Sequence, residues 1–187
     1  MSTIVLEKNN TLPKKWVGVF LGDVVIPIKG KKPKNLGVKS DELTIPYVDI
    51  KAFEKNEFDK FTTDKTCPKC SKTDVLIVWD GSRSGLVGTG VSGVIGSTLS
   101  KLFCFDINSK YLYYFLQVHY KKLNKNPKGI GIPHIDPDLL WSLRFPIPPL
   151  IEQKRIVEKI EELFLEIDYI KKILENNKLQ LKQYVKS

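Results

Sequence analysis

The last quarter of the chain, residues 147–187, carries the pattern that most restricts what this protein can fold into. Apolar residues recur there in alternating steps of four and three, interrupted only by the polar Asn177. The repeated apolar positions are Ile156, Ile160, Leu163, Ile167, Ile170, Leu174, Leu181 and Tyr184. This spacing is the a/d repeat of a coiled coil, so the segment predicts one long helix with a narrow apolar stripe.

Two prolines define where this helix begins. Pro148 and Pro149 cannot lie inside a helix, which places the first helical residue near Leu150, and neither glycine nor proline follows. A helix of about 35 residues is about 50 Å long at a rise of 1.5 Å per residue. A body of about 150 residues is only about 30 Å across, so much of the stripe needs a partner from elsewhere.

No second heptad pattern is present in the sequence, so we expect the partner helix to come from another molecule. The residues predicted to mediate self-association are Ile156, Ile160, Leu163, Ile167, Ile170, Leu174, Asn177 and Leu181. Asn177 occupies a d position, where a polar residue fixes the register of a pairing at some cost in stability. The alternative is a solitary helix that folds back on its own domain.

The positive charge of the chain lies almost entirely before the helix. The formal net charge is +9, and the eight basic and seven acidic residues after Leu150 account for +1 of it, which leaves 9 − 1 = +8. Such a basic domain favours a polyanionic partner, with nucleic acid ahead of an anionic membrane surface. No run of 18 apolar residues and no signal peptide is recognisable, and three cysteines fit reduced thiols, so we expect a cytoplasmic protein.

Three segments supply candidate DNA contacts: a basic loop at 29–35, a glycine-bounded tip at 81–85, and the lysines at the end of a predicted helix at 110–122 and in the basic loop at 123–133 after it. The candidate residues are Lys31, Lys32, Lys34, Ser82, Arg83, Ser84, Lys121, Lys122, Lys125 and Lys128. The lysines are candidates for phosphate contacts, although solvated lysine loops are common on protein surfaces. Arg83, on a short tip between two serines, is the best-placed side chain for a base edge or a phosphate.

The glycine-rich segment at 81–96 follows a predicted buried strand at 73–80. Gly88, Gly90 and Gly93 satisfy the G-x-G-x-x-G pattern of dinucleotide-binding proteins, but the residues that follow are rich in β-formers and do not open a helix. We therefore interpret the glycines as hairpin turns and bulges that let the backbone approach a partner closely.

Cys67 and Cys70 have the spacing of half a zinc knuckle. The remaining candidate ligands, Cys104, His119 and His134, are scattered without the spacing of a second half. A plain turn with two thiols is the preferred interpretation, and we expect neither a metal nor another cofactor.

The rest of the chain predicts structural rather than catalytic roles. The strand at 43–50 contains Pro46, which favours an edge position. Apolar residues on most faces of the helix at 110–122 predict that it is buried. His119 and Trp141 are expected to be core residues. No set of residues suitable for catalysis assembles, so the chain is expected to bind rather than to react.

Residues 145–157, which read FPIPPLIEQKRIV, resemble the signature found where a target recognition domain meets its conserved helix in the specificity subunits of type I restriction-modification enzymes. Weaker matches lie upstream in the usual order of that family, at 12–16, 21–24, 45–48 and 73–77. The resemblance covers nearly the whole chain, and the motif before the helix is its most specific part.

The resemblance implies an α/β (α+β) target recognition domain at 1–146, followed by a conserved dimerisation and spacer helix at 147–187 that forms an intermolecular antiparallel coiled coil. It implies a subunit without chemistry of its own that directs methyltransferase and restriction subunits to a bipartite target in double-stranded DNA. Members of the family normally carry two recognition domains and two helices. One of each is present here, which fits a natural half-sized subunit, a fragment or a truncated gene product, and we expect the chain to act as a homodimer.

Two other functions fit parts of the sequence. One is a DNA-binding regulator or architectural dimer that is unrelated to methylation. The other is a metal-dependent nuclease built on Asp41, Asp49 and Lys51, for which only a short-range coincidence of carboxylates is visible.

Overall fold

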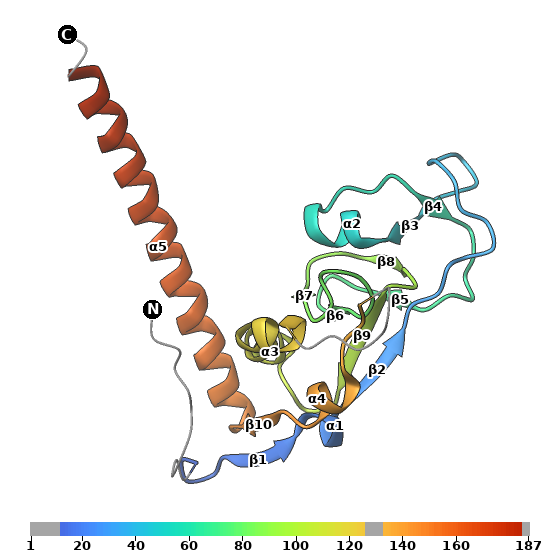
Figure 1. Ribbon diagram of the computed structural model, residues 1–187, viewed down its shortest axis with the longest axis horizontal. Coiled ribbons are helices and arrows are strands. Elements are labelled where there is room, and N and C mark those ends of the chain that lie inside the picture. Colours follow the sequence, from blue (N-terminus) through green and yellow to red (C-terminus); the bar gives the residue numbers. More distant parts are fainter. Residues whose placement is uncertain (1–11, 126–132, 185–187) are drawn as a thin grey trace.

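The long helix predicted from the heptad pattern is α5 (Leu150–Tyr184), an uninterrupted rod of 35 residues that projects from a body of small sheets and short helices (Figure 1). The computed structural model describes residues 12–125 and 133–184. The prediction of one helix that begins near Leu150 is therefore confirmed. No helix in the described ranges is both long enough and apolar enough to cross a membrane.

The body is built from ten short strands and four helices among the described residues. The strands are β1 (Val17–Phe20), β2 (Val25–Lys29), β3 (Ile45–Val48), β4 (Phe61–Thr62), β5 (Lys69–Cys70), β6 (Val75–Val78), β7 (Val87–Gly88), β8 (Gly93–Ile95), β9 (Leu99–Cys104) and β10 (Arg144–Ile147). The helices are α1 (Leu21–Val24), α2 (Ile50–Lys55), α3 (Ser109–Lys125) and α4 (Pro137–Trp141).

Strand β6 is buried on both of its faces. It lies inside an antiparallel sheet of order β2-β9-β6-β7. Val75 and Ile77 belong to the core shared with α3, whereas Leu76 and Val78 belong to a second core shared with α2 and β8. Because successive side chains of a strand point to opposite faces, burial on both faces explains the unbroken apolar run that predicted this strand.

Strand β3 lies inside the second sheet, of order β4-β3-β8-β5, and the prediction that Pro46 marks an edge strand is wrong. Strand β4 pairs antiparallel with the first half of β3, and β8 pairs parallel with the second half. Pro46 has no N–H to donate. The next residue, Tyr47, donates its N–H to the carbonyl of Lys60, just before β4, at 2.9 Å, so β3 remains hydrogen-bonded on this side.

The glycine-rich segment forms β7, β8 and the turns around them, and β9 rather than a helix follows, as expected. Gly93 has a φ of 152°, and a Cβ atom added there would lie 2.2 Å from the carbonyl oxygen of Pro46. Only glycine allows the two backbones to come this close. The segment therefore contributes β7 to the first sheet and β8 to the second, and the close approach at Gly93 lies between β8 and β3.

Helix α3 buries one side rather than all of its faces, so the prediction of a buried helix at 110–122 is too broad. Leu112 and Leu116 are fully buried, whereas the side chain of Val118 is 81% exposed. His119 is half-buried, and its Nδ1 lies 2.9 Å from the carbonyl oxygen of Phe115. Trp141 is also half-buried, with its ring 6.1 Å from that of Trp79. Both lie at the margin of the core because α3 and α4 cover only one side of the sheet.

The junction between the body and α5 is held by buried polar contacts. The side chain of Gln153 is 1% exposed, its Oε1 accepts from the N–H of Asn108 at 2.8 Å, and its Nε2 donates to the carbonyl of Pro148 at 2.9 Å. The hydroxyl of Tyr111 donates to the carbonyl of Pro146 at 2.8 Å, and burial raises its pKa to about 12. These bonds fix the first turn of α5 to the start of α3.

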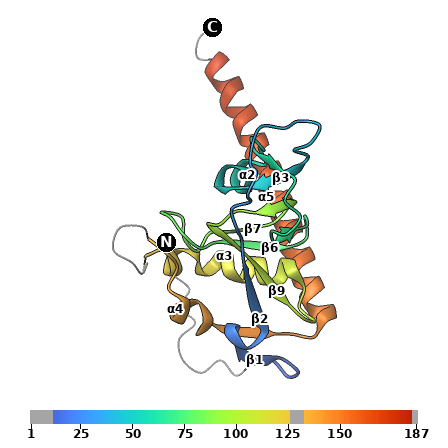
Figure 2. The ribbon, with the colours of Figure 1, turned by 90° about the vertical axis from the view of Figure 1, so that its right-hand side faces the viewer.

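Strand β1, the first strand of the body in sequence, also contributes to this junction. It pairs antiparallel with β10 over four residues, from Val17 opposite Ile147 to Phe20 opposite Arg144. Phe145 of β10 is fully buried in the main core. Strand β1 therefore lies beside β10, the strand that leads into α5 (Figure 1 and Figure 2).

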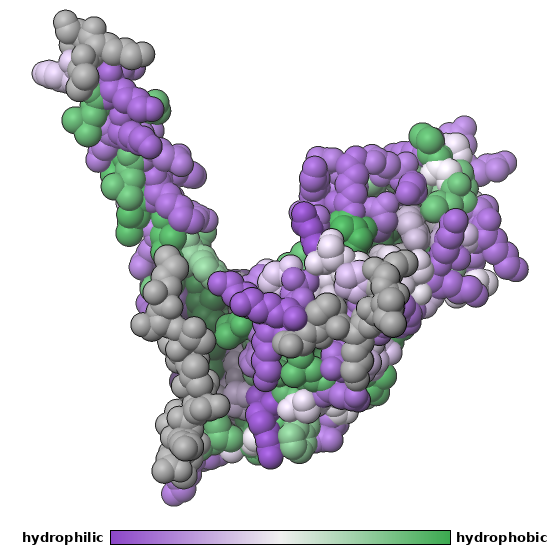
Figure 3. Space-filling view, in the orientation of Figure 1, coloured by the Kyte–Doolittle hydropathy of each residue, from purple (hydrophilic) through white to green (hydrophobic). Residues whose placement is uncertain are grey.

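The contact of α5 with the body extends to Phe164, whose ring centroid lies 6.0 Å from that of Tyr114, and all residues from 162 to 184 are exposed. Hydrophobic side chains follow the projecting helix among hydrophilic ones in Figure 3. A helix folded back on its own domain is therefore not the arrangement found.

Candidate nucleic-acid interface

The tip at residues 81–85, here called the Arg83 tip, is a tight turn that follows β6. Gly81 and Gly85 bound it with φ values of 110° and 89°, in the region that favours glycine. The N–H of Gly85 donates to the carbonyl of Val78 at 2.8 Å, which returns the chain to β7. Ser82 and Arg83 are exposed at the outer end of this turn.

Ser84 was predicted to contact DNA, but the structure buries it. Its side chain is 1% exposed, and its hydroxyl has no hydrogen-bond partner among the described residues. The turn that brings Gly85 back to the sheet directs residue 84 inward, so its hydroxyl cannot reach a surface ligand. The surface part of the tip is therefore Ser82 and Arg83.

Two side chains from other elements hold the Arg83 tip. The guanidinium of Arg83 pairs with the carboxylate of Glu54 on α2, and the two side chains are 56% and 17% exposed. From the last turn of α3, Nδ2 of Asn124 donates to the carbonyl oxygens of Ser82 and Ser84, both at 3.0 Å. The carbonyls on either side of Arg83 are thus bound by one amide.

Asn124 also brings the tip beside the predicted lysines of α3. Lys121, Lys122 and Lys125 are exposed on the last turns of the helix. Lysines at the C-terminal end of a helix are favourably placed relative to its dipole. Lys128 lies outside the described residues.

The basic loop at 31–34 leaves the sheet at the end from which the Arg83 tip also leaves. Lys29, the last residue of β2, pairs with Asp80 just before the tip, with Nζ 2.6 Å from Oδ2. Lys31, Lys32 and Lys34 are exposed beyond it. The basic loop and the Arg83 tip, separated by about 50 positions in the sequence, therefore lie at the same end of the sheet. Arg83 and Lys29 each pair with an acidic side chain there.

This arrangement suits two different kinds of contact. Lysine ammonium groups on flexible stems act as point charges toward phosphates. A guanidinium on a fixed tip can present several N–H donors in one plane, which is the geometry that base edges require. Glu54, Asn124 and Lys29 were not predicted as parts of this region. Only Lys29, at the start of the basic loop, had a signal in the sequence.

The two cysteines of the half-knuckle have protein partners. Sγ of Cys67 lies 3.5 Å from Oδ2 of Asp64, and Sγ of Cys70 lies 3.6 Å from the carbonyl oxygen of Gly93. Burial raises the pKa of the Cys70 thiol to about 11. Within the described ranges, no group of three or more metal-binding side chains is found.

The residues of the nuclease alternative have structural partners. Asp49 caps the first turn of α2, since its Oδ1 accepts from the N–H of Ala52 at 3.0 Å. Lys51 turns to Asp59, with Nζ 2.5 Å from Oδ2. Asp41 is exposed. These contacts account for Asp49 and Lys51 without a metal site.

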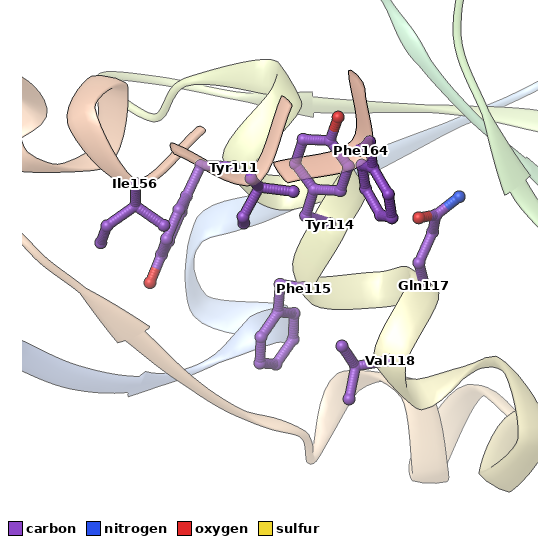
Figure 4. Close-up of a pocket in the computed structure, with 8 residues that line it drawn as sticks. Tyr111, Tyr114, Phe115, Gln117, Val118, Ile156 and Phe164 are labelled. Atoms are coloured by element: carbon purple, nitrogen blue, oxygen red, sulfur yellow. The ribbon is translucent and has the colours of Figure 1, made fainter. Parts of the chain in front are cut away.

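The predicted self-association stripe divides into two parts. Ile156 and Ile160 are half-buried and, with Phe164, line one side of an apolar hollow of about 320 Å³ whose other side is formed by Tyr114 and Val118 of α3 (Figure 4). The remaining stripe residues are exposed on the projecting helix. They are Leu163, Ile167, Ile170, Leu174, Asn177 and Leu181.

The body, its basic end and the projecting helix together match one family of DNA-recognition proteins. Residues 13–179 match the family described as the type I restriction modification DNA specificity domain, and the chain belongs to this family. The resemblance stated from residues 145–157 is therefore confirmed.

Relatives with curated names are specificity subunits. The chain is 33% identical over 168 residues to the type I restriction enzyme MjaVIII specificity subunit of Methanocaldococcus jannaschii, a match that covers 88% of this chain and 39% of the relative. It is 26% identical over 194 residues to the EcoKI specificity subunit of Escherichia coli strain K12, which covers 92% and 41%. The chain thus spans about two fifths of the length of these relatives.

Solved structures share the fold. A chain from a type I R-M system superposes with a TM-score of 0.75 at 23% identity, covering 93% of this chain and 44% of that one. The HsdS subunit from Thermoanaerobacter tengcongensis gives a TM-score of 0.70 at 23% identity, covering 89% and 42%. The predicted α/β recognition domain followed by one long helix is confirmed as the fold.

Proposed function

We propose that this chain is a sequence-specific DNA-binding specificity subunit of a type I restriction-modification system. In this role it directs methyltransferase and restriction subunits to a bipartite target in double-stranded DNA in the cytoplasm. The observation that carries the proposal is the family match over residues 13–179, which includes both the body and most of α5. Relatives in this family are named as specificity subunits. The proposed role of this chain is therefore to recognise DNA, while other subunits carry out catalysis.

The proposed division of labour follows the two parts of the chain. Residues 1–146 form the target recognition domain, and residues 147–187 form the helix for dimerisation and spacing. The apolar stripe supports self-association, because its members from Ile167 to Leu181 are exposed. Pairing of two copies through antiparallel helices would place one recognition domain near each end of a common rod.

DNA affinity should fall steeply as salt rises, because lysines that neutralise phosphates release counterions. Replacing Lys121, Lys122 and Lys125 with glutamine should make the plot of log affinity against log salt shallower by about 3, since each phosphate contact contributes about 0.9. The loss should be similar on every sequence. Fluorescence anisotropy with labelled duplexes at several salt concentrations measures the slope.

The matched control removes the same charge from the projecting helix. Lys171, Lys172 and Lys178 lie on α5 outside the body, and their replacement with glutamine should leave the slope nearly unchanged. If the variant at Lys121, Lys122 and Lys125 has the same slope as the unchanged chain, these lysines do not contact phosphates. Lys31, Lys32 and Lys34 are tested in the same way.

The proposed homodimer also predicts the form of the DNA target. Two identical domains related by a twofold axis read the same bases on opposite strands, so the target should be an inverted repeat with an unread gap. Duplicating one heptad in the exposed part of α5 lengthens the rod by about 10 Å. The preferred gap should then grow by about three base pairs at about 3.4 Å each, with the half-sites unchanged.

Methylation by the complex assembled with its methyltransferase subunits, on DNA libraries of varied spacing, measures this gap. The control is a chain with a substitution on the polar face of α5 that does not change the length of the helix. This variant should keep the original gap between the half-sites. An asymmetric or continuous target would contradict the symmetric pair. Methylation that does not depend on the chain at all would favour a regulator unrelated to modification.

A further inference from the structure

Arg83 stands on a tip that has little support of its own. The tip is five residues long, with glycines at both ends, and the side chain of Arg83 is 56% exposed. A side chain on such a turn samples many positions unless other elements fix it. Two contacts from separate elements provide that support here.

The first support is Glu54, which stands on a firmly anchored helix. Helix α2 is capped by Asp49 at its start, and Phe53 packs in the second core with its ring against Gly88, where an added Cβ atom would lie 2.6 Å from the ring. The side chain of Glu54 is only 17% exposed, so its carboxylate depends on the guanidinium as its partner. This pairing fixes the position of one guanidinium nitrogen of Arg83.

The guanidinium retains most of its binding capacity in this pose. It carries five N–H donors in one plane, and the pairing with Glu54 is made through Nη1. The remaining donors belong to an exposed group whose range of positions is restricted by the contact with the Glu54 carboxylate. A preoriented planar donor set loses less entropy on binding a base edge than a freely rotating one does.

The second support is Asn124, which acts on the backbone of the tip. Its Nδ2 binds the carbonyls of Ser82 and Ser84, the two residues that flank Arg83. Asn124 belongs to the same helical turns as Lys121 and Lys125. The tip is therefore held in register with the lysines proposed to contact phosphates.

We infer that Glu54 and Asn124 are positioning residues that aim Arg83 at a base edge, with guanine as the expected base, and that they determine specificity without touching DNA. Arginine binds guanine through two parallel hydrogen bonds to O6 and N7, and this geometry requires a fixed guanidinium plane. The inference rests on the proposed DNA-binding function and assigns residues of α2 and α3 to sequence readout.

A double-mutant cycle tests whether Glu54 acts through Arg83. The variants are Glu54→Gln, Arg83→Ala and the pair together, and the measured quantity is the ratio of affinities for two duplexes at fixed salt. One duplex is selected from a random pool by the unchanged chain, and the other is a scrambled version of it. Arg83→Ala should lower the ratio about tenfold or more, and Glu54→Gln should lower it severalfold with no loss of affinity for the scrambled duplex.

The decisive measurement is Glu54→Gln in the Arg83→Ala background, where it should change the ratio no further. A purely structural role for Glu54 would lower the melting temperature and would change binding in both backgrounds. Asn124→Asp, which replaces the donor amide by a carboxylate, should lower the ratio in the same direction. Glu57→Gln is the matched control, because Glu57 is exposed on the same segment and pairs with Lys51 instead.

The outcomes separate the inference from the proposed function. If the unchanged chain prefers its selected duplex and Glu54→Gln leaves that preference intact, the positioning role is wrong while the function stands. Equal effects of Glu54→Gln with and without Arg83 also overturn the positioning role. An unchanged chain that binds all duplexes equally overturns the proposed function, and the inference with it.

Discussion

Replacing Ile167 and Ile170 with aspartate should leave the chain monomeric at tens of micromolar, where the unchanged chain should pair. Both side chains are about half exposed on the part of α5 that has left the body, at 45% and 54%. Full burial of an isoleucine is worth about 1.5 to 3 kcal/mol, so burying the exposed half is worth about 0.75 to 1.5 kcal/mol. A symmetric pair loses four such contributions, which amounts to about 3 to 6 kcal/mol and roughly 100- to 10 000-fold in the dissociation constant.

Leu165→Asp provides the matched control for this experiment. Leu165 is 73% exposed on the same helix, and two positions correspond to about 200° of rotation, so it lies on the opposite side from Ile167. Sedimentation equilibrium should find this variant paired and the Ile167/Ile170 variant monomeric. A monomeric unchanged chain, or equal weakening by Leu165→Asp, would contradict pairing along the predicted stripe. Circular dichroism shows whether the helix itself persists.

Replacing Gln153 with methionine should destabilise the chain by about 3 kcal/mol. Methionine matches the size of glutamine, but it leaves the N–H of Asn108 and the carbonyl of Pro148 without their partner. Each unsatisfied group that loses its bond inside a protein costs about 1 to 3 kcal/mol. For a chain of this size, the melting temperature should fall by about 6 to 12 °C, measured by calorimetry.

Lys154→Met places the same side chain one position further along, on the exposed side of the helix. Its free energy of unfolding should change by no more than about 0.5 kcal/mol. If the two variants melt at the same temperature, the buried amide contributes nothing to the junction between the body and α5. The comparison therefore isolates the hydrogen bonds of Gln153 from the helix propensity of methionine.

The features that could be predicted from the sequence depend on signals between near neighbours. The start of α5 follows from Pro148 and Pro149, and its length follows from a repeat that continues through Leu181. Strand β6 was recognisable because covering both faces of a sheet demands a continuous apolar run. The family resemblance at residues 145–157 also rests on one local segment, whose buried members include Phe145, Gln153 and Val157.

The features that were missed depend on contacts between distant segments. Pro46 indicated an edge strand, but the strands that flank β3 come from residues about 15 and 50 positions away. Asn124 reaches the Arg83 tip across 42 and 40 positions, and Glu54 reaches it across 29. Nothing in the local pattern of either residue signals these contacts. The burial of Ser84 likewise depends on how its turn packs, which composition does not determine.

The pairing of β1 with β10 has a consequence for how such a protein can diversify. The chain enters the body at Val17 and leaves it at Ile147, and these two residues lie opposite each other in the same short ladder. A body whose entry and exit are adjacent can be exchanged as one unit, because a replacement needs only to reproduce two strands at the root of the helix. New surface loops could then be combined with an unchanged α5, so that under the proposed function the DNA sequence recognised and the geometry of the dimer can evolve independently.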